Sequence, residues 1–178
     1  MELRHIIFCV IIALPFANAS CSSGKNVTDE YTQKASDFPC MEYGISDGNI
    51  FRATANSTSS TISLAHEKAI VAAKALLGNA IIEKVTKTAR NYTEEIGLPD
   101  NAAFLNNVKT IANKAVDNTL GDKLPICEKY SETNSRYTAY VAVEIDIQTV
   151  IEEFSRLAAK NLPDIDVEKL KKFLLDKR

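Results

Sequence analysis

The sequence contains little of the material from which metal centres and catalytic sites are usually built. Its 178 residues include four cysteines, two histidines and no tryptophan. The cysteines and histidines show no CxxC or HxxxH spacing, so a zinc site is not expected. The sequence also lacks the GxSxG, GxGxxG and GxxxxGK(S/T) motifs. Because these motifs mark serine nucleophiles and phosphate-binding loops, we expect neither a cofactor nor an enzymatic activity.

An excess of basic residues is also missing. Lysine and arginine number 21 against 23 aspartates and glutamates, which gives a net charge of -2. Nucleic-acid binding is therefore disfavoured, because it depends on neutralising many phosphates. The hydrophobic fraction of 46% and the charged fraction of 25% are typical of a globular protein. The length suits one domain.

The longest apolar run lies near the N-terminus. Residues Ile6–Phe16 are almost entirely apolar and follow Arg4. This run is too short to cross a bilayer as a helix, which takes about 20 residues, but it has the length of a signal-peptide core. We therefore expect residues 1–20 to direct export of the chain.

Two processing sites compete at the end of this signal. The small residues Ala17 and Ala19 favour cleavage before Ser20, which would release a soluble chain. The order Ala19-Ser20-Cys21 is typical of the end of a bacterial lipoprotein signal, in which the cysteine carries the lipid. Polar residues 21–37 then suit a tether, followed by a domain over 38–178.

The cysteine count favours lipidation. After removal of the signal, Cys21, Cys40 and Cys127 remain, and an odd number is awkward in an exported protein. If Cys21 carries lipid, Cys40 and Cys127 are left to form a disulfide in an oxidising compartment. The alternative is a pair of unbonded, buried thiols.

Hydrophobic periodicity predicts an α+β fold. Alternation predicts strands at 50–56 and 136–147, with a further strand candidate at 124–131 that forms a hairpin with the second. Three- and four-residue spacing predicts helices at 62–92, from Asp100 to 120, and at 148–162, before a short final helix. Gly78 inside the long helix marks either a close contact or a break. The elements fit a small antiparallel sheet of about three strands with long amphipathic helices packed on one face.

The chain resembles a known family over about residues 38–148. The motifs are the Phe51-Arg52-Ala53 strand before an alanine-rich helix, Pro39-Cys40, Ile126–Lys129, and Tyr137–Glu144. They are similar to the small membrane-associated lipoproteins first described from Helicobacter, of about twenty kilodaltons, and most of all to uncharacterised relatives in Bacteroidetes. The N-terminal domain of the flagellar assembly protein T has a related helix-on-sheet unit. The resemblance implies a cell-envelope lipoprotein and supplies no catalytic residue.

Few side chains are candidates for a functional role. His66 fits a surface position better than a catalytic base, and Glu144 and Asp146 fit the solvent face of a strand. Tyr130, Tyr137 and Tyr140 are candidates for an interaction surface if they gather on the sheet. We therefore expect a non-enzymatic lipoprotein of the periplasmic or outer face of the envelope, attached to the membrane by lipid on Cys21, with envelope proteins as partners. The alternative is a soluble periplasmic domain, released after Ala19, that binds a small ligand or a glycan.

Overall fold

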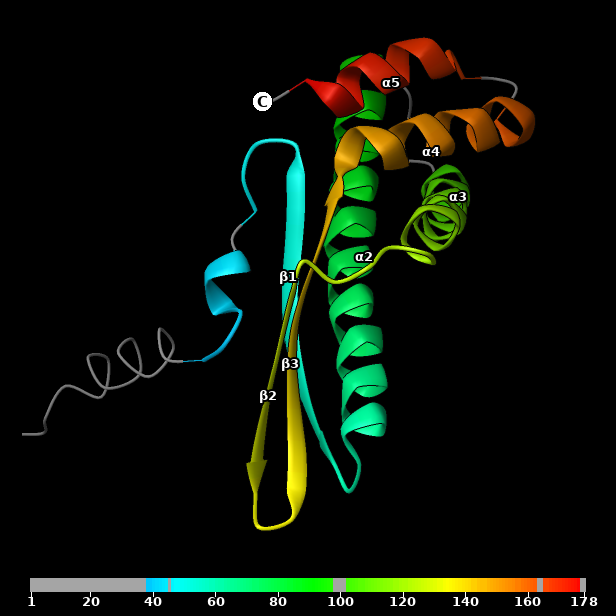
Figure 1. Cartoon of the computed structure of the whole chain (residues 1–178). Coiled ribbons are helices and arrows are strands. Elements are labelled where there is room, and N and C mark those ends of the chain that lie inside the picture. Colours follow the sequence, from blue (N-terminus) through cyan, green and yellow to red (C-terminus); the bar gives the residue numbers. More distant parts are fainter. Residues whose placement is uncertain (1–37, 45, 98–101, 163–164, 177–178) are drawn as a thin grey trace, which may run out of the picture.

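The computed structural model describes residues 38–44, 46–97, 102–162 and 165–176 (Figure 1). The predicted signal, both cleavage sites, Cys21, the tether and the Asp100 helix start lie outside these residues. The elements in chain order are the 3-10 helix η1 (Met41–Tyr43), β1 (Ile50–Ser59), α2 (Ile62–Glu95), α3 (Ala102–Leu120), β2 (Cys127–Thr133), β3 (Arg136–Asp146), α4 (Ile147–Asn161) and α5 (Val167–Leu175).

The three strands form one antiparallel sheet in the order β1-β3-β2. The hairpin between β2 and β3 is confirmed, and its two-residue turn, Asn134-Ser135, has positive φ at both positions (52° and 59°). Such turns match the twist of paired strands. β3 lies in the centre because it pairs with both β1 and β2. Ala53 of β1 pairs with Val143 of β3, so these two side chains point to the same face of the sheet.

Helix α2 covers one face of the sheet (Figure 1). It begins where Thr61 Oγ1 accepts a hydrogen bond from Leu64 N (3.3 Å). Ala65, Ala69 and Ala73 are completely buried against the strands. Their small side chains let the helix lie close to the sheet, and the predicted α+β architecture is thus confirmed.

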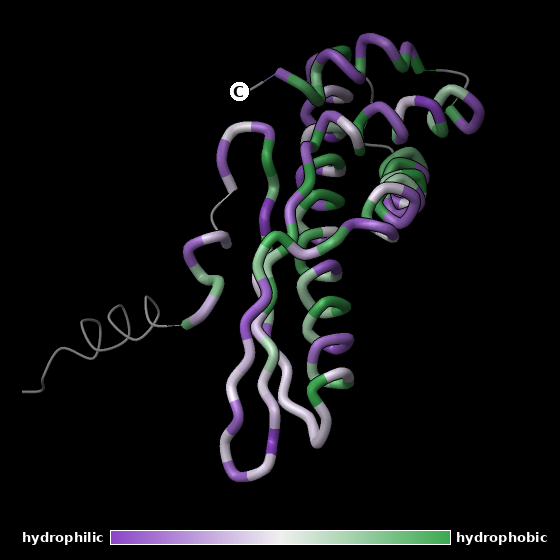
Figure 2. The backbone as a smooth tube through the Cα atoms, viewed as in Figure 1, coloured by the Kyte–Doolittle hydropathy of each residue, from purple (hydrophilic) through white to green (hydrophobic). Residues whose placement is uncertain are grey.

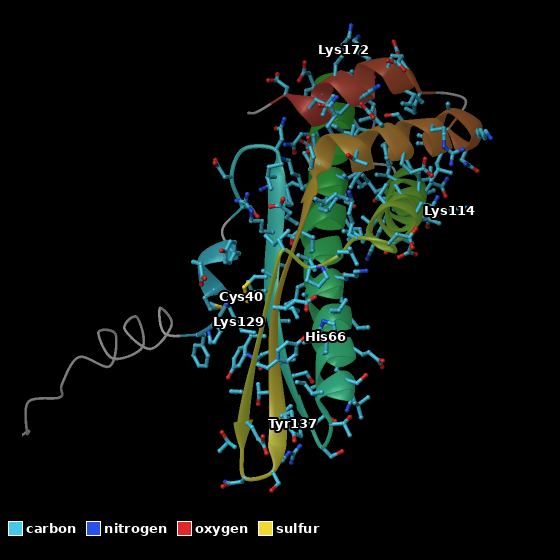
Figure 3. The ribbon with its side chains drawn as sticks, viewed as in Figure 1. Cys40, His66, Lys114, Lys129, Tyr137 and Lys172 are labelled. Carbon is cyan, nitrogen blue, oxygen red and sulfur yellow. A yellow bond between two sulfur atoms is a disulfide. The ribbon has the colours of Figure 1, made fainter. Side chains whose placement is uncertain are left out.

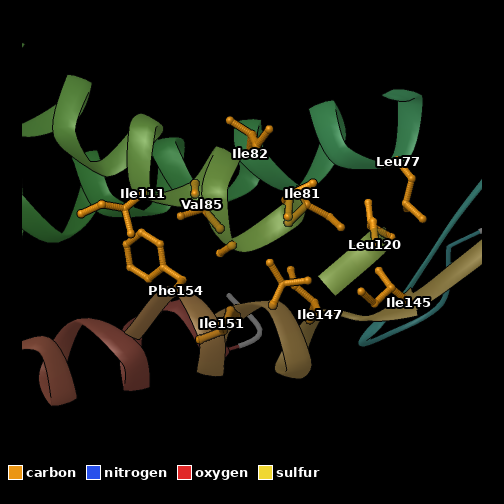
Figure 4. Packing of buried hydrophobic residues seen from close by; sticks show 14 of the residues in the cluster. Leu77, Ile81, Ile82, Val85, Ile111, Leu120, Ile145, Ile147, Ile151 and Phe154 are labelled. Carbon is orange, nitrogen blue, oxygen red and sulfur yellow. The ribbon is translucent and has the colours of Figure 1, made fainter. Parts of the chain in front are cut away.

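At one end of the sheet, α3 and α5 pack on α2, and α4 packs on α3 and α5. Figure 4 shows Phe154 of α4 beside Ile111 of α3, and the Phe154 side chain is fully buried. Gly78 marks a close contact, because a Cβ at this position would lie 2.9 Å from Val116 Cγ1 of α3. The hydrophobic core is therefore concentrated at this end. The tip of the β2–β3 hairpin is polar (Figure 2).

Candidate functional site

The N-terminal segment (38–44 and 46–49) lies on the face of the sheet opposite α2 (Figure 1). Cys40 forms a disulfide with Cys127 at the start of β2, as the cysteine count predicted, and the two residues are 87 positions apart. Cys40 is buried and packs with Cys127 against Ala142 of β3. The bond fixes the N-terminal segment across the sheet.

Further contacts extend this attachment to the other two strands. The Phe38 and Tyr140 rings lie 6.4 Å apart, and Thr54 Oγ1 of β1 lies 3.4 Å from the Met41 sulfur. At the edge of β1, Arg52 N donates a hydrogen bond to Ser46 Oγ (3.0 Å). This segment therefore contacts all three strands of the sheet.

The three tyrosines do not gather on one face. Tyr130 pairs with Ala139, so it lies with Tyr137 on the side of the sheet that carries α2. Tyr140 occupies the opposite face, beside Phe38. The register therefore does not place Tyr130, Tyr137 and Tyr140 on one common surface, because successive residues of a strand point to opposite faces.

Tyr130 instead joins a small polar cluster with His66 and Glu128. The Tyr130 hydroxyl donates a hydrogen bond to Glu128 Oε2 (3.2 Å), and the His66 and Tyr130 rings meet edge to face at 5.8 Å. Partial burial, followed by the negative charge of Glu128 and this hydrogen bond, raises the pKa of Tyr130 above its usual value of 10. The phenol is therefore a neutral donor at neutral pH.

His66 connects this cluster to α2 (Figure 3). Its Nε2 lies 3.2 Å from Glu128 Oε1, but the contact is not aligned as a hydrogen bond. Nε2 is buried and has no hydrogen-bond partner among the described residues. The cluster offers no hydroxyl or thiol nucleophile oriented by the imidazole, because the Tyr130 proton is directed to Glu128. The cluster of His66, Glu128 and Tyr130 links β2 to the start of α2.

Glu144 and Asp146 serve the fold in separate ways. Glu144 Oε2 accepts a hydrogen bond from Arg52 Nε (2.9 Å), which pairs β3 with β1. Asp146 Oδ1 accepts one from Gln148 N (2.9 Å) at the start of α4. The two carboxylates therefore bind different partners, one on β1 and one at the start of α4. Within the described residues, no three histidine, cysteine or acidic side chains are grouped as metal ligands would be.

The sequence analysis did not identify β2 as an exposed strand edge with apolar residues beside it. Among the described residues, β2 pairs with β3 alone, and its residues after Cys127 are exposed. Ile126 continues this edge with its N–H bonded to Ala142 O (2.8 Å), and Leu124 just before it is 82% exposed. Apolar residues within a predicted strand are usually buried in a core. Only the pairing of the strands shows that this edge is not buried.

Comparisons with known proteins identify no relative. No family model matches the chain, and no curated protein or solved structure is significantly similar to it. The fold and its cross-link define a small α+β domain fastened by one disulfide. The resemblance to the envelope lipoproteins stays a prediction. Within the described part of the chain, no helix is both long and apolar enough to span a bilayer.

Proposed function

We propose that the protein is a bacterial cell-envelope lipoprotein, held to a membrane by lipid on Cys21, whose α+β domain is a non-enzymatic interaction module. In this proposal the protein resembles the Helicobacter-type lipoproteins and their Bacteroidetes relatives. The disulfide between Cys40 and Cys127 supports export, because such bonds persist in oxidising compartments and are rare in the cytosol. The apolar run Ile6–Phe16 supplies the export signal.

The open edge of β2 is the observation that carries the interaction role. An unpaired strand edge presents backbone donors and acceptors to an extended segment of another protein, which adds to the sheet as a further strand. Leu124, Ile126 and Tyr130 flank this edge with exposed apolar surface. Lys129 and Glu132 on the same strand disfavour indiscriminate pairing and select a partner of complementary charge.

Site-specific crosslinking tests this role. A photoreactive amino acid at Leu124 or Tyr130 in the full chain, expressed in the envelope, is expected to capture the same partner protein at both positions. The matched control carries the probe at Lys172 on α5, which is exposed at the opposite end of the molecule (Figure 3). Capture at all three positions, or at none under several growth conditions, would contradict the docking role of β2.

The anchor is tested separately by the mass of the mature protein. The lipoprotein hypothesis expects a chain that begins at Cys21 and carries acyl mass. A Cys21→Ser variant would lack that mass and leave the membrane fraction. An unmodified chain that begins at Ser20 would refute the anchor without bearing on β2.

A soluble ligand-binding domain released after Ala19 is the second candidate. The observation in its favour is the exposure of Phe38 and Tyr43 on the N-terminal segment, since exposed rings can stack on sugars. Soluble glycan fragments would then bind the unanchored protein and lose affinity in a Tyr43→Ala variant. No change in affinity would reject this candidate.

A further inference from the structure

A hollow on the outer side of the contact between α2 and α3 combines several positive charges. Its volume is about 530 Å³, within the range of small-molecule sites. Lys87 and Arg90 of α2 and Lys109 of α3 line it, with Glu83 as a counter-charge. The ionised side chains of the lining therefore sum to +2, whereas the whole chain carries -2.

These cations are available to a ligand. The ion pairs among the described residues join Arg52 to Glu144, His66 to Glu128, and Arg156 to Glu153. None of them involves Lys87, Arg90 or Lys109. Three basic side chains from two helices thus line one hollow. None of them has a carboxylate partner within 4 Å among the described residues. All three are exposed to solvent, and an anion bound between them would be attracted by each.

The rest of the lining suits the organic part of such an anion. Ile82 provides an apolar floor, and the Asn79 amide adds hydrogen-bonding groups. The Thr86 hydroxyl is buried and has no hydrogen-bond partner among the described residues. Glu83 can accept hydrogen bonds from hydroxyl groups but would repel a second anionic group.

We propose that this hollow binds a phosphate ester attached to a hydroxylated group, such as a glycerol phosphate or a sugar phosphate. The phosphate lies among Lys87, Arg90 and Lys109, and Arg90 is suited to two-point recognition of its oxygens. The hydroxyls of the organic part face Glu83 and Asn79. A soluble metabolite and a lipid headgroup share this chemistry. The site is independent of the open edge of β2.

Calorimetric titration of the full chain with glycerol 3-phosphate tests the proposal. We expect saturable binding that weakens with added salt, because the contacts are partly screened charge pairs. An Arg90→Gln/Lys109→Gln variant should bind at least about tenfold more weakly, a change of about 1.4 kcal/mol. The matched control, Lys68→Gln/Lys172→Gln, removes the same charge from exposed positions on α2 and α5 and should keep wild-type affinity.

A third variant separates ligand contact from support of the fold. Thr86→Val keeps the shape of the side chain and removes the unpartnered hydroxyl, so the thermal midpoint should not fall. Because this hydroxyl has almost no accessible surface, binding of glycerol 3-phosphate should stay at the wild-type level. Wild-type affinity in the Arg90/Lys109 variant would overturn the proposal. Equal losses in the charge control and the Arg90/Lys109 variant would also overturn it, because the effect would then be general electrostatics.

Vesicles distinguish the two sources of the ligand. The same variants are compared for binding to phosphatidylcholine vesicles with and without phosphatidylglycerol. If the Arg90/Lys109 variant loses the phosphatidylglycerol-dependent part while the control keeps it, the ligand is a headgroup. If glycerol 3-phosphate binding depends on these residues and vesicle binding does not, the ligand is soluble.

Discussion

Removal of the disulfide should cost the domain a large part of its stability. The variant replaces both Cys40 and Cys127 by alanine, because a serine at either buried site would add a second penalty. The bond joins residues 87 positions apart, and the closed loop contains β1, α2 and α3. In the chain-entropy model, a loop of this length corresponds to about 4.5 kcal/mol at 25 °C. Typical domains have only about 5–15 kcal/mol in total.

Urea unfolding followed by circular dichroism measures this difference. The free energy of unfolding should fall by about 4.5 kcal/mol. The dependence on urea should become steeper, because the uncrosslinked denatured chain exposes more surface. Cys21→Ala is the control, since Cys21 lies outside the closed loop, and it should match the wild type. A loss below about 1 kcal/mol with an unchanged urea dependence would refute the loop-entropy reasoning.

Three further predictions concern the helical end of the molecule. Phe154→Ala should lower the free energy of unfolding by about 3–5 kcal/mol, because it empties a fully buried position; a loss below 1 kcal/mol in urea unfolding would contradict this. Gly78→Ala should destabilise the domain although alanine has the better helix propensity, because the added Cβ would meet Val116. In a Val116→Ala background, the same change should stabilise the domain by up to about 1 kcal/mol. The free energies of unfolding of the wild type, the two single variants and the double variant measure this reversal. Hydrogen bonds from Arg156 and Asn118 lower the pKa of Glu153 to about 2, so its stabilising effect should be complete above pH 4.5 and fade as the pH falls towards 2. A Glu153→Gln variant should therefore differ from the wild type at pH 7 and converge with it near pH 2, and a difference independent of pH would exclude the ion pair as its cause.

Local sequence patterns were sufficient to predict most of the elements. Alternation along Arg136–Asp146 and the alanines of α2 report directly on which side chains are buried, since each element has a fixed period. The disulfide followed from counting, because only one pair of cysteines remained once the signal and Cys21 were assigned. Gly78 was recognised as special, but the sequence left a break and a close contact equally open.

The candidate sites depended on long-range pairing. The register of β2 against β3 separated Tyr140 from Tyr130 and brought His66 of α2 to Glu128. Glu144, expected on the solvent face of its strand, binds Arg52 of the neighbouring strand. Predicting these contacts requires the order and the register of the strands. A shift of one residue in the register would move every side chain of a strand to the opposite face.

The sequence by itself determined the kinds of element, their order and the one available cross-link, because propensity, periodicity and cysteine count act over short stretches of chain. Only the tertiary structure decided that β3 lies in the centre, that β2 is left as an open edge, and that the basic side chains of α2 and α3 meet around one hollow. These features depend on how the buried faces of elements that are distant in the sequence pack against one another. Side chains far apart in the sequence become neighbours only through that packing.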